Sequence, residues 1–308
     1  MEGATGLGGL GRRATLPKMN QSSTQIGPSE VHPDAYPVAR IGTEFLLRGV
    51  DLVTEAQDDV VDGLIVMTLV RDQMISPRRK AIGVRALSRR LDMPYTTIRR
   101  HVETLARNGQ CVAEGGALVV PAAVLRGRRV ATFLRKIYVN AVRLLADLTR
   151  IDVASFASTS RRPVRAGRLA REQATVAVAA TGLLLVGIRT MRAFWGGDLT
   201  KGLVFTAIWT ANVKHVTNTA PAGARAVLPD SQRQPVSVLA ISRSLRLPYE
   251  TVRRHADALL QAGICVRSGR HGLRVPASFV QGVPEAIATP YRLIMDFLAE
   301  LRRVGVNV

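Results

Sequence analysis

The sequence of 308 residues contains few cysteines, few aromatic residues and few acidic residues for its length. Its two cysteines, Cys111 and Cys265, are too few for a framework of disulfide bonds and are typical of a reducing compartment. Aromatic residues make up 5% of the chain, so its cores must be built mainly from Leu, Val, Ile and Ala. Acidic residues number 23 against 43 lysines and arginines, and the resulting net charge of +20 favours a polyanionic partner.

Long apolar segments are also missing. Residues 1–18 are rich in glycine and contain no apolar run of the kind that a signal peptide needs. The most apolar segment, residues 174–188, is shorter than the roughly 20 residues of a membrane-spanning helix and is followed by Arg189. We therefore expect a buried helix here, no contact with a membrane, and a cytoplasmic protein.

Residue patterns of several enzyme classes are absent as well. The sequence has no Walker phosphate loop, dinucleotide fingerprint, metalloprotease helix or nucleophile elbow, and its carboxylates are scattered. His101 with Cys111, and His255 with Cys265, offer two ligands each, whereas a structural zinc ion needs four. We predict no catalytic residues, no cofactor and no metal, and we expect both cysteines to be small buried hydrophobic residues.

Two segments of the chain are repeats of one another. Residues 84–112 (VRALSRRLDMPYTTIRRHVETLARNGQCV) and 238–266 (VLAISRSLRLPYETVRRHADALLQAGICV) are identical at 15 of 29 positions without a gap. Weaker similarity extends to both sides of these segments. It relates residues 118–121 to 273–276, residues 59–69 to 198–208, and residues 46–50 to 184–188.

This repeat predicts the domain organisation. We expect a disordered head at residues 1–37, a first repeat at 38–155, an Arg-rich linker at 156–172 and a second repeat at 173–308. The linker carries its arginines among Ser, Pro and Gly, which is typical of a flexible connection.

Each repeat has the spacing of two short helices joined by a tight turn. Apolar residues recur at helical spacing over residues 84–91, and this helix must end before Pro94, which disfavours helical geometry at the preceding residue. Pro94 suits the first turn of the next helix, and Gly109 suits its end. Pro248 and Gly263 repeat this pattern.

A β-hairpin is expected after the second helix. In the first repeat, apolar strands at 111–113 and 118–120 flank the turn Glu114-Gly115-Gly116. A helix-turn-helix followed by a hairpin is a winged helix. The predicted fold class is therefore mainly α with small β wings, arranged as two tandem winged helix-turn-helix units with extra flanking helices.

The two quoted segments resemble the DNA-binding core of bacterial winged helix-turn-helix regulators of the MarR, IclR and GntR types. The shared pattern is a small-residue helix, a Leu-x-x-Pro turn, Thr-Val/Ile-x-Arg-His and Leu-x-x-x-Gly, over about 40 residues in each repeat. This resemblance implies double-stranded DNA as the partner and places the second helix of each unit in the major groove.

The residues expected to contact DNA follow from this docking and from helical periodicity. With Ile98 buried, Thr96 and Arg100 point away from the core, and Arg99 lies at the flank of that face. One arginine of each pair would bind guanine bidentately and the other a phosphate, in an order that the sequence leaves open. The predicted DNA-contacting residues are Tyr95, Thr96, Arg99, Arg100, Tyr249, Glu250, Arg253, Arg254, Arg267, Arg270 and Arg274.

Some neighbouring side chains allow two interpretations. Tyr95 and Tyr249, at the start of each second helix, either reach a phosphate or pack under the turn. His101 and His255 are expected to pack beside the core rather than to contact phosphate.

The two predicted wings differ in charge. The first turn carries Glu114 and no cation, whereas Arg267, Arg270 and Arg274 surround the second. Since a basic wing favours contact with phosphate and an acidic one opposes it, we expect the second repeat to contribute more to DNA binding.

Broad apolar faces predict long helices outside these units. They span residues 41–57, 58–75, 130–151, 175–193, 199–215 and 290–304. We expect them to form an enlarged core that joins the two repeats. A homodimer interface or a small-molecule pocket stays open as an alternative, with any effector unknown.

Three functions are compatible with these features. The first is a transcriptional regulator that binds an operator with both units. The second is a plasmid-type replication initiator, which would bind directly repeated sites. The third is a protein-interaction scaffold, against which the charge and the arginine pairs count.

Overall fold

The computed structural model describes residues 32–75, 82–156, 169–217, 226–270 and 272–308. Within these ranges the protein is mainly helical with small antiparallel sheets, as the sequence predicts. The first helix begins at Ala35, inside the predicted head. Most of the predicted linker lies outside the described residues, so the boundaries at 155 and 173 stay a prediction.

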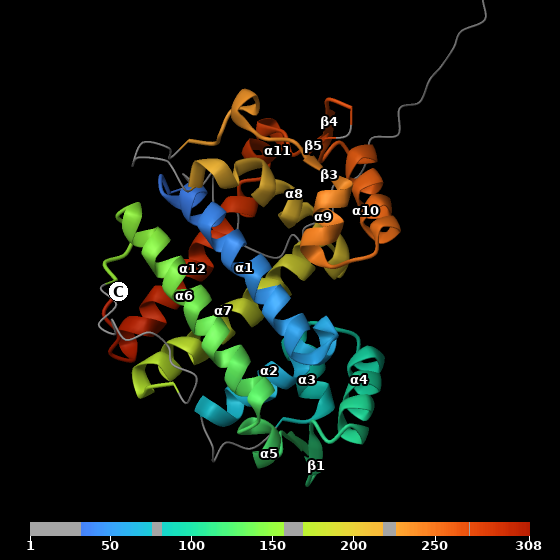
Figure 1. Ribbon diagram of the computed structural model, residues 1–308, viewed down its shortest axis with the longest axis vertical. Helices are drawn as coiled ribbons and strands as arrows, with labels where there is room; N and C mark the ends of the chain where they lie inside the picture. Colours follow the sequence, from blue (N-terminus) through green and yellow to red (C-terminus); the bar gives the residue numbers. More distant parts are fainter. Residues whose placement is uncertain (1–31, 76–81, 157–168, 218–225, 271) are drawn as a thin grey trace, which may run out of the picture.

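The helices and the hairpin follow the same order in both repeats, and the second repeat has two additional short elements between its second and third α-helices (Figure 1). The first contains α1 (Ala35–Gln57), α2 (Val60–Ile75), α3 (Val84–Leu91), α4 (Tyr95–Arg107), β1 (Val112–Glu114), β2 (Ala117–Val119), α5 (Ala122–Leu125) and α6 (Arg128–Arg150). The second contains α7 (Arg171–Phe194), α8 (Leu199–Thr217), the short 3-10 helix η1 (Asp230–Gln232), β3 (Val236–Ser237), α9 (Val238–Leu245), α10 (Tyr249–Gln261), β4 (Val266–Ser268), β5 (Gly272–Arg274), α11 (Ala277–Gly282) and α12 (Glu285–Arg303).

The turns between α3 and α4 and between α9 and α10 are held in the same way. The Ser88 hydroxyl donates to the Met93 carbonyl at 2.6 Å, and the equivalent Ser242 hydroxyl donates to the Leu247 carbonyl at 2.8 Å. Each hydroxyl therefore fixes the chain just before the proline that precedes the second helix. The sequence predicts the ends of these helices within a residue or two because proline and glycine mark them.

An amide side chain holds each hairpin against the preceding long helix. In the first repeat, Gln73 of α2 accepts from the Val120 N–H at 2.8 Å and donates to the Val120 carbonyl at 3.1 Å. In the second, Asn212 of α8 accepts from the Val275 N–H at 2.9 Å and donates to the Leu273 carbonyl at 3.1 Å. These bonds satisfy backbone groups where each hairpin ends.

The segment before the helix-turn-helix pairs with the hairpin in both repeats, but to a different extent. β1 pairs with β2 in an antiparallel sheet, and Ile82 adds a single bridge to Leu118. In the second repeat this bridge becomes the strand β3, which gives a sheet of order β3-β5-β4. The sequence predicts both strands of the first hairpin, each displaced by one residue, but misses β3.

The long helices exchange partners between the repeats. α1 packs against α6 of its own repeat and α12 of the other, while α7 packs against α12 of its own repeat and α6 of the other. Likewise, α1 contacts α8 and α7 contacts α2. A two-fold axis produces such reciprocal contacts, whereas a translation does not. The two repeats are therefore related by a pseudo-two-fold axis.

Two glycines form the crossing of α1 and α7. A Cβ atom on Gly49 would lie 2.4 Å from Leu184 Cδ1, and one on Gly187 would lie 3.1 Å from Leu46 Cδ1. Gly49 and Gly187 are equivalent in the repeat, as are Leu46 and Leu184. The contact is therefore reciprocal, with each glycine admitting the leucine of the other helix.

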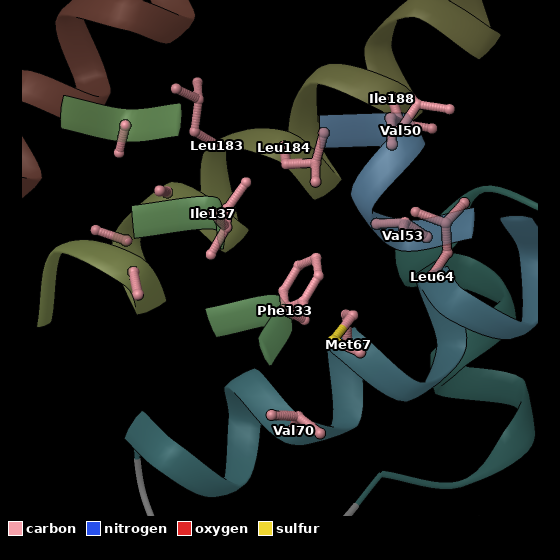
Figure 2. Packing of buried hydrophobic residues seen from close by; sticks show 14 of the residues in the cluster. Val50, Val53, Leu64, Met67, Val70, Phe133, Ile137, Leu183, Leu184 and Ile188 are labelled. Carbon is pink, nitrogen blue, oxygen red and sulfur yellow. The ribbon is translucent and has the colours of Figure 1, made fainter. Parts of the chain in front are cut away.

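The main hydrophobic core contains side chains of both repeats. Figure 2 shows Phe133 of α6 and Met67 of α2 in the same buried cluster as Leu184 of α7 and Val53 of α1. All four side chains are at most 2% exposed. This bears out the expectation that the flanking helices join the two repeats.

The pseudo-two-fold arrangement brings α4 and α10 to the same side of the molecule. In Figure 1 both helices lie on the right, with β1 at the lower end and β4 at the upper end. The helices α6 and α12 and the C-terminus lie toward the opposite side. The predicted DNA-contacting helices thus share one edge of the protein.

The helix α7 is longer than the apolar segment within it. By length and composition it is the one described helix that could cross a membrane, yet half of its most apolar stretch is buried inside the protein. Its neighbours are α1, α2, α6, α8 and α12. This burial is typical of the core helix of a soluble protein.

Candidate nucleic-acid interface

The outer faces of α4 and α10 carry the residues predicted to contact DNA. Ile98, Val102 and Leu105 attach α4 to the core, and Val252, Ala256 and Leu259 do the same for α10. The predicted residues of these helices are all exposed: Tyr95, Thr96, Arg99, Arg100, Tyr249, Glu250, Arg253 and Arg254.

One arginine of each pair forms ion pairs along its own helix. Arg99 Nε lies 2.7 Å from Glu103 Oε1, four residues away. Arg253 lies 2.8 Å from Glu250 and 3.2 Å from Asp257. The hydrogen bond to Glu103 raises the pKa of Arg99, and the bond to Glu250 raises that of Arg253. Both guanidinium groups are held along the helix surface.

The other arginine of each pair has no such partner. Among the residues that the structure describes, neither Arg100 nor Arg254 forms an ion pair or a side-chain hydrogen bond, and both are exposed. A shallow depression on α10 is lined by Arg254 and Arg253 beside Glu250. The free guanidinium groups therefore stand at equivalent positions of the two helices.

The three arginines of the second hairpin differ in exposure and in their interactions with other residues. Arg270 is exposed at the turn, with no ion pair in the described part of the chain. Arg267 is 63% exposed and lies 3.6 Å from Asp257 of α10. Arg274 is 24% exposed and donates to the Asp230 carbonyl at 2.9 Å. Arg274 thus links the hairpin to η1, and most of its side chain is buried against the protein.

Tyr95 and Tyr249 do not pack under the turn. Their exposed fractions are 41% and 45%, which leaves the hydroxyl groups accessible at the start of each helix. The Arg85 guanidinium lies over the Tyr95 ring at 5.9 Å, so Arg85 adds a cation beside this helix that sequence reasoning missed. The pairing joins two different helices, and no short-range spacing indicates it.

The two histidines connect α4 and α10 to the start of the preceding long helix. His101 Nδ1 lies 2.7 Å from Asp62 and 3.8 Å from Asp59. His255 Nδ1 lies 3.7 Å from Asp198, the equivalent of Asp59. Packing beside the core was expected for both histidines, but their carboxylate partners were not.

Asp59, Asp62 and His101 also form the one group among the described residues that brings three potential metal ligands together. Asp59 Oδ1 already accepts from the N–H groups of Val61 and Asp62, and thereby caps α2. In the second repeat Lys201 replaces Asp62, while the contact between histidine and aspartate remains. A role in positioning α4 on α2 accounts for these contacts.

Both cysteines are buried, as expected from the sequence. Cys111 is 0% exposed and Cys265 is 2% exposed. Burial raises the pKa of both thiols, that of Cys265 to about 12. Neither thiol has the ionised, accessible character of a reactive cysteine.

Comparisons of the chain with protein-family models, with curated proteins and with solved structures found no match.

Proposed function

We propose that this protein is a transcriptional regulator that binds double-stranded DNA sequence-specifically through two winged helix-turn-helix units. The observation that carries the proposal is the unpaired, exposed arginine at the same position of α4 and α10, Arg100 and Arg254. An arginine on a groove-facing helix binds guanine O6 and N7 bidentately. The net charge of +20 supports phosphate contacts around these helices.

The ion pairs suggest which arginine of each pair contacts a base and which contacts a phosphate. Arg99 and Arg253 are held by acidic neighbours on their own helices, so binding a base would first require these pairs to break. Arg100 and Arg254 have no pair to break. We assign base contact to Arg100 and Arg254, and phosphate contact at the flank to Arg99 and Arg253.

The pseudo-two-fold axis favours an inverted repeat as the binding site. Operator symmetry follows protein symmetry, so two units related by a two-fold axis suit half-sites of opposite orientation. The half-sites need not be identical, since Thr96 in α4 corresponds to Glu250 in α10. This geometry favours a regulator over an initiator that binds direct repeats, and one chain supplies both units without a second copy.

The test is capture of sheared genomic DNA by the purified protein, followed by sequencing. We expect enrichment of promoter fragments that share an inverted repeat. Arg100→Ala/Arg254→Ala should abolish the enrichment, whereas Arg302→Ala/Arg303→Ala, which removes the same charge from the exposed end of α12, should retain it. Enrichment of direct repeats would favour the initiator.

Salt dependence separates DNA binding from a scaffold role. Each neutralised phosphate should contribute about −0.9 to the slope of log affinity against log salt concentration. Because several arginines surround each unit, we expect a steep slope. No enrichment of any DNA, or no dependence on salt, would contradict the proposed function and favour the scaffold.

A further inference from the structure

A cavity of about 630 Å³ lies between α1, α7, α8 and α12. Its volume falls within the range of small-molecule pockets. The walls come from both repeats, because α1 precedes the first unit and the other three helices belong to the second repeat. Its apolar lining includes Phe45, Leu183, Met191, Trp195, Phe205 and Trp209.

The corresponding space in the first repeat is filled by side chains. Ile137 of α6 and Ile294 of α12 occupy equivalent buried positions, and this alignment places Phe133 opposite Pro290. Phe133 is 2% exposed and lies near Met67 in the same buried cluster (Figure 2). The residue of α8 equivalent to Met67 is Thr206. The second repeat therefore has two smaller side chains, Pro290 and Thr206, and both line the cavity.

The wall formed by α8 is aromatic only in the second repeat. Phe205 and Trp209 line the cavity where the first repeat has Val66 and Val70. Trp195 adds a third ring, whose centroid lies 4.9 Å from that of Phe205. Aromatic rings thus line the space that the smaller Pro290 and Thr206 leave open, and ring stacking suits a flat aromatic ligand.

A few polar groups accompany these rings. Glu285 is the one charged residue among the described residues that line the cavity. It is 43% exposed, accepts from Thr289 at 2.9 Å and forms an ion pair with Arg292 at 2.8 Å. The indole N–H of Trp209 is buried and has no hydrogen-bond partner in the described structure. Pro290 has no N–H, so it cannot donate to the Ala286 carbonyl as other residues of α12 would.

We propose that this cavity binds a flat aromatic small molecule that carries no net charge. The rings and the other apolar side chains of the lining supply the contact. The Glu285 carboxylate is already paired with Arg292, so the lining offers a charged ligand no free counter-charge to replace its hydration. The proposal concerns binding alone and does not depend on the proposed DNA-binding function.

The position of the cavity allows its occupant to influence the second unit. The helix α8, which forms its aromatic wall, also packs against α9 and α10. A ligand that displaces Phe205 or Trp209 would therefore act on the helix that supports Arg254. Phe133 fills the equivalent site of the first repeat, so we expect the effect of the ligand to be confined to the second unit.

Intrinsic fluorescence provides a direct test, since the chain has two tryptophans and both line the cavity. The purified full chain is titrated, without DNA, with the neutral probe N-phenylnaphthylamine and with its anionic relative anilinonaphthalene sulfonate. We expect saturable one-site binding of the neutral probe with energy transfer from Trp195 and Trp209. The sulfonate should bind at least about tenfold more weakly. Glu285→Gln should reduce this difference, because it leaves Arg292 without its carboxylate partner.

Two variants restore the residues of the first repeat. Pro290→Phe and Thr206→Met should each weaken binding of the neutral probe by about tenfold or more. Val139→Phe, which adds a ring at an exposed position of α6, should not. Circular dichroism and thermal unfolding identify any variant that fails to fold. Failure of the probe to bind, equal binding of both probes, or unchanged binding by both folded filling variants would overturn the proposal.

Discussion

Gly49 of α1 lies directly against Leu184 of α7, so closely that a Cβ atom on Gly49 would come within 2.4 Å of Leu184 Cδ1. The equivalent Gly187 admits Leu46 of α1 in the same way. Because each helix supplies both a glycine and a leucine, this crossing lies at the centre of the pseudo-two-fold arrangement and sets the distance between the two repeats.

The first prediction concerns this crossing. Gly49→Ala should destabilise the protein by about 1–3 kcal/mol, because Leu184 is fully buried and has little room to move. Gly187→Ala should cost less, since its nearest contact would be 3.1 Å. The control is Gly282→Ala, where a Cβ atom would meet nothing within 4 Å. Urea unfolding measures all three, and equal stability of the Gly49 and Gly282 variants would contradict the close crossing.

The second prediction concerns the amide that holds the second hairpin. Asn212 is 0% exposed and bonds the Val275 N–H, the Leu273 carbonyl and the Gln234 carbonyl. Asn212→Ala removes this partner from the buried Val275 N–H and Leu273 carbonyl, which costs about 1–3 kcal/mol for each group left unsatisfied.

Hydrogen exchange checks this effect locally. In Asn212→Ala, the amides of β4 and β5 should exchange faster, while those of β1 and β2 should keep their rates. Gln73→Ala is the matched variant in the first repeat and should show the opposite pattern. Faster exchange in both hairpins of either variant would mean that each substitution acts on global stability instead.

The third prediction follows from the pKa of Cys265, which burial raises to about 12. The unfolded thiol ionises near pH 8.5, whereas the folded thiol stays protonated, so the unfolded state binds fewer protons in this range. Stability should therefore fall by about 1.4 kcal/mol per pH unit as pH rises from about 8.5 toward 12.

Urea unfolding at several alkaline pH values, in the presence of reductant, measures this slope. Cys265→Ala removes the thiol and should flatten the slope, although the cavity that it creates lowers stability at every pH. Cys111, Tyr138 and Tyr291, whose pKa values burial also raises, contribute to the part that remains. An identical slope in the wild type and in Cys265→Ala would disagree with the burial of this thiol.

The fourth prediction ranks the two units and depends on the proposed function. Arg253→Ala/Arg254→Ala should weaken specific DNA binding more than Arg99→Ala/Arg100→Ala, with about 1–3 kcal/mol lost for each base contact. The reason is the wing, where Arg270 is exposed and free of ion pairs in the described residues while Glu114 opposes phosphate. Titration of both variants on one captured site decides the order, and a larger loss in the first-repeat variant would reverse it.

Short-range sequence signals predict the local structure well. Pro94 and Gly109 mark the ends of α4, and the buried positions of Ile98, Val102 and Leu105 agree with helical periodicity. The ion pair of Arg99 with Glu103 also follows from a spacing of four residues. Strands of three residues are harder to place, because they contain too few alternations to fix their ends.

Contacts between segments that are distant in the chain cannot be predicted from the sequence. The bond from Arg274 to Asp230 spans a long connection, and no spacing indicates that this predicted phosphate contact is partly occupied by protein. The repeat is compatible with either a two-fold axis or a translation, and only the contacts of α1 and α7 decide between them. Pro290, which lines the cavity, lies in a helix where the two repeats have diverged too far to align by residue identity.

The charges at equivalent positions of the two turns are opposite. Asp92 of the first repeat forms an ion pair with Arg192 of α7 at 2.9 Å. Its equivalent, Arg246, attracts the Asp51 carboxylate of α1 and opposes the rise that burial causes in the pKa of Asp51. The charge in each turn is therefore complementary to a charge on the long helix of the other repeat. The paired arrangement forms within a single polypeptide as soon as it folds, however dilute the protein is, and a substitution in one half leaves the other half unaltered, which no assembly of identical subunits allows.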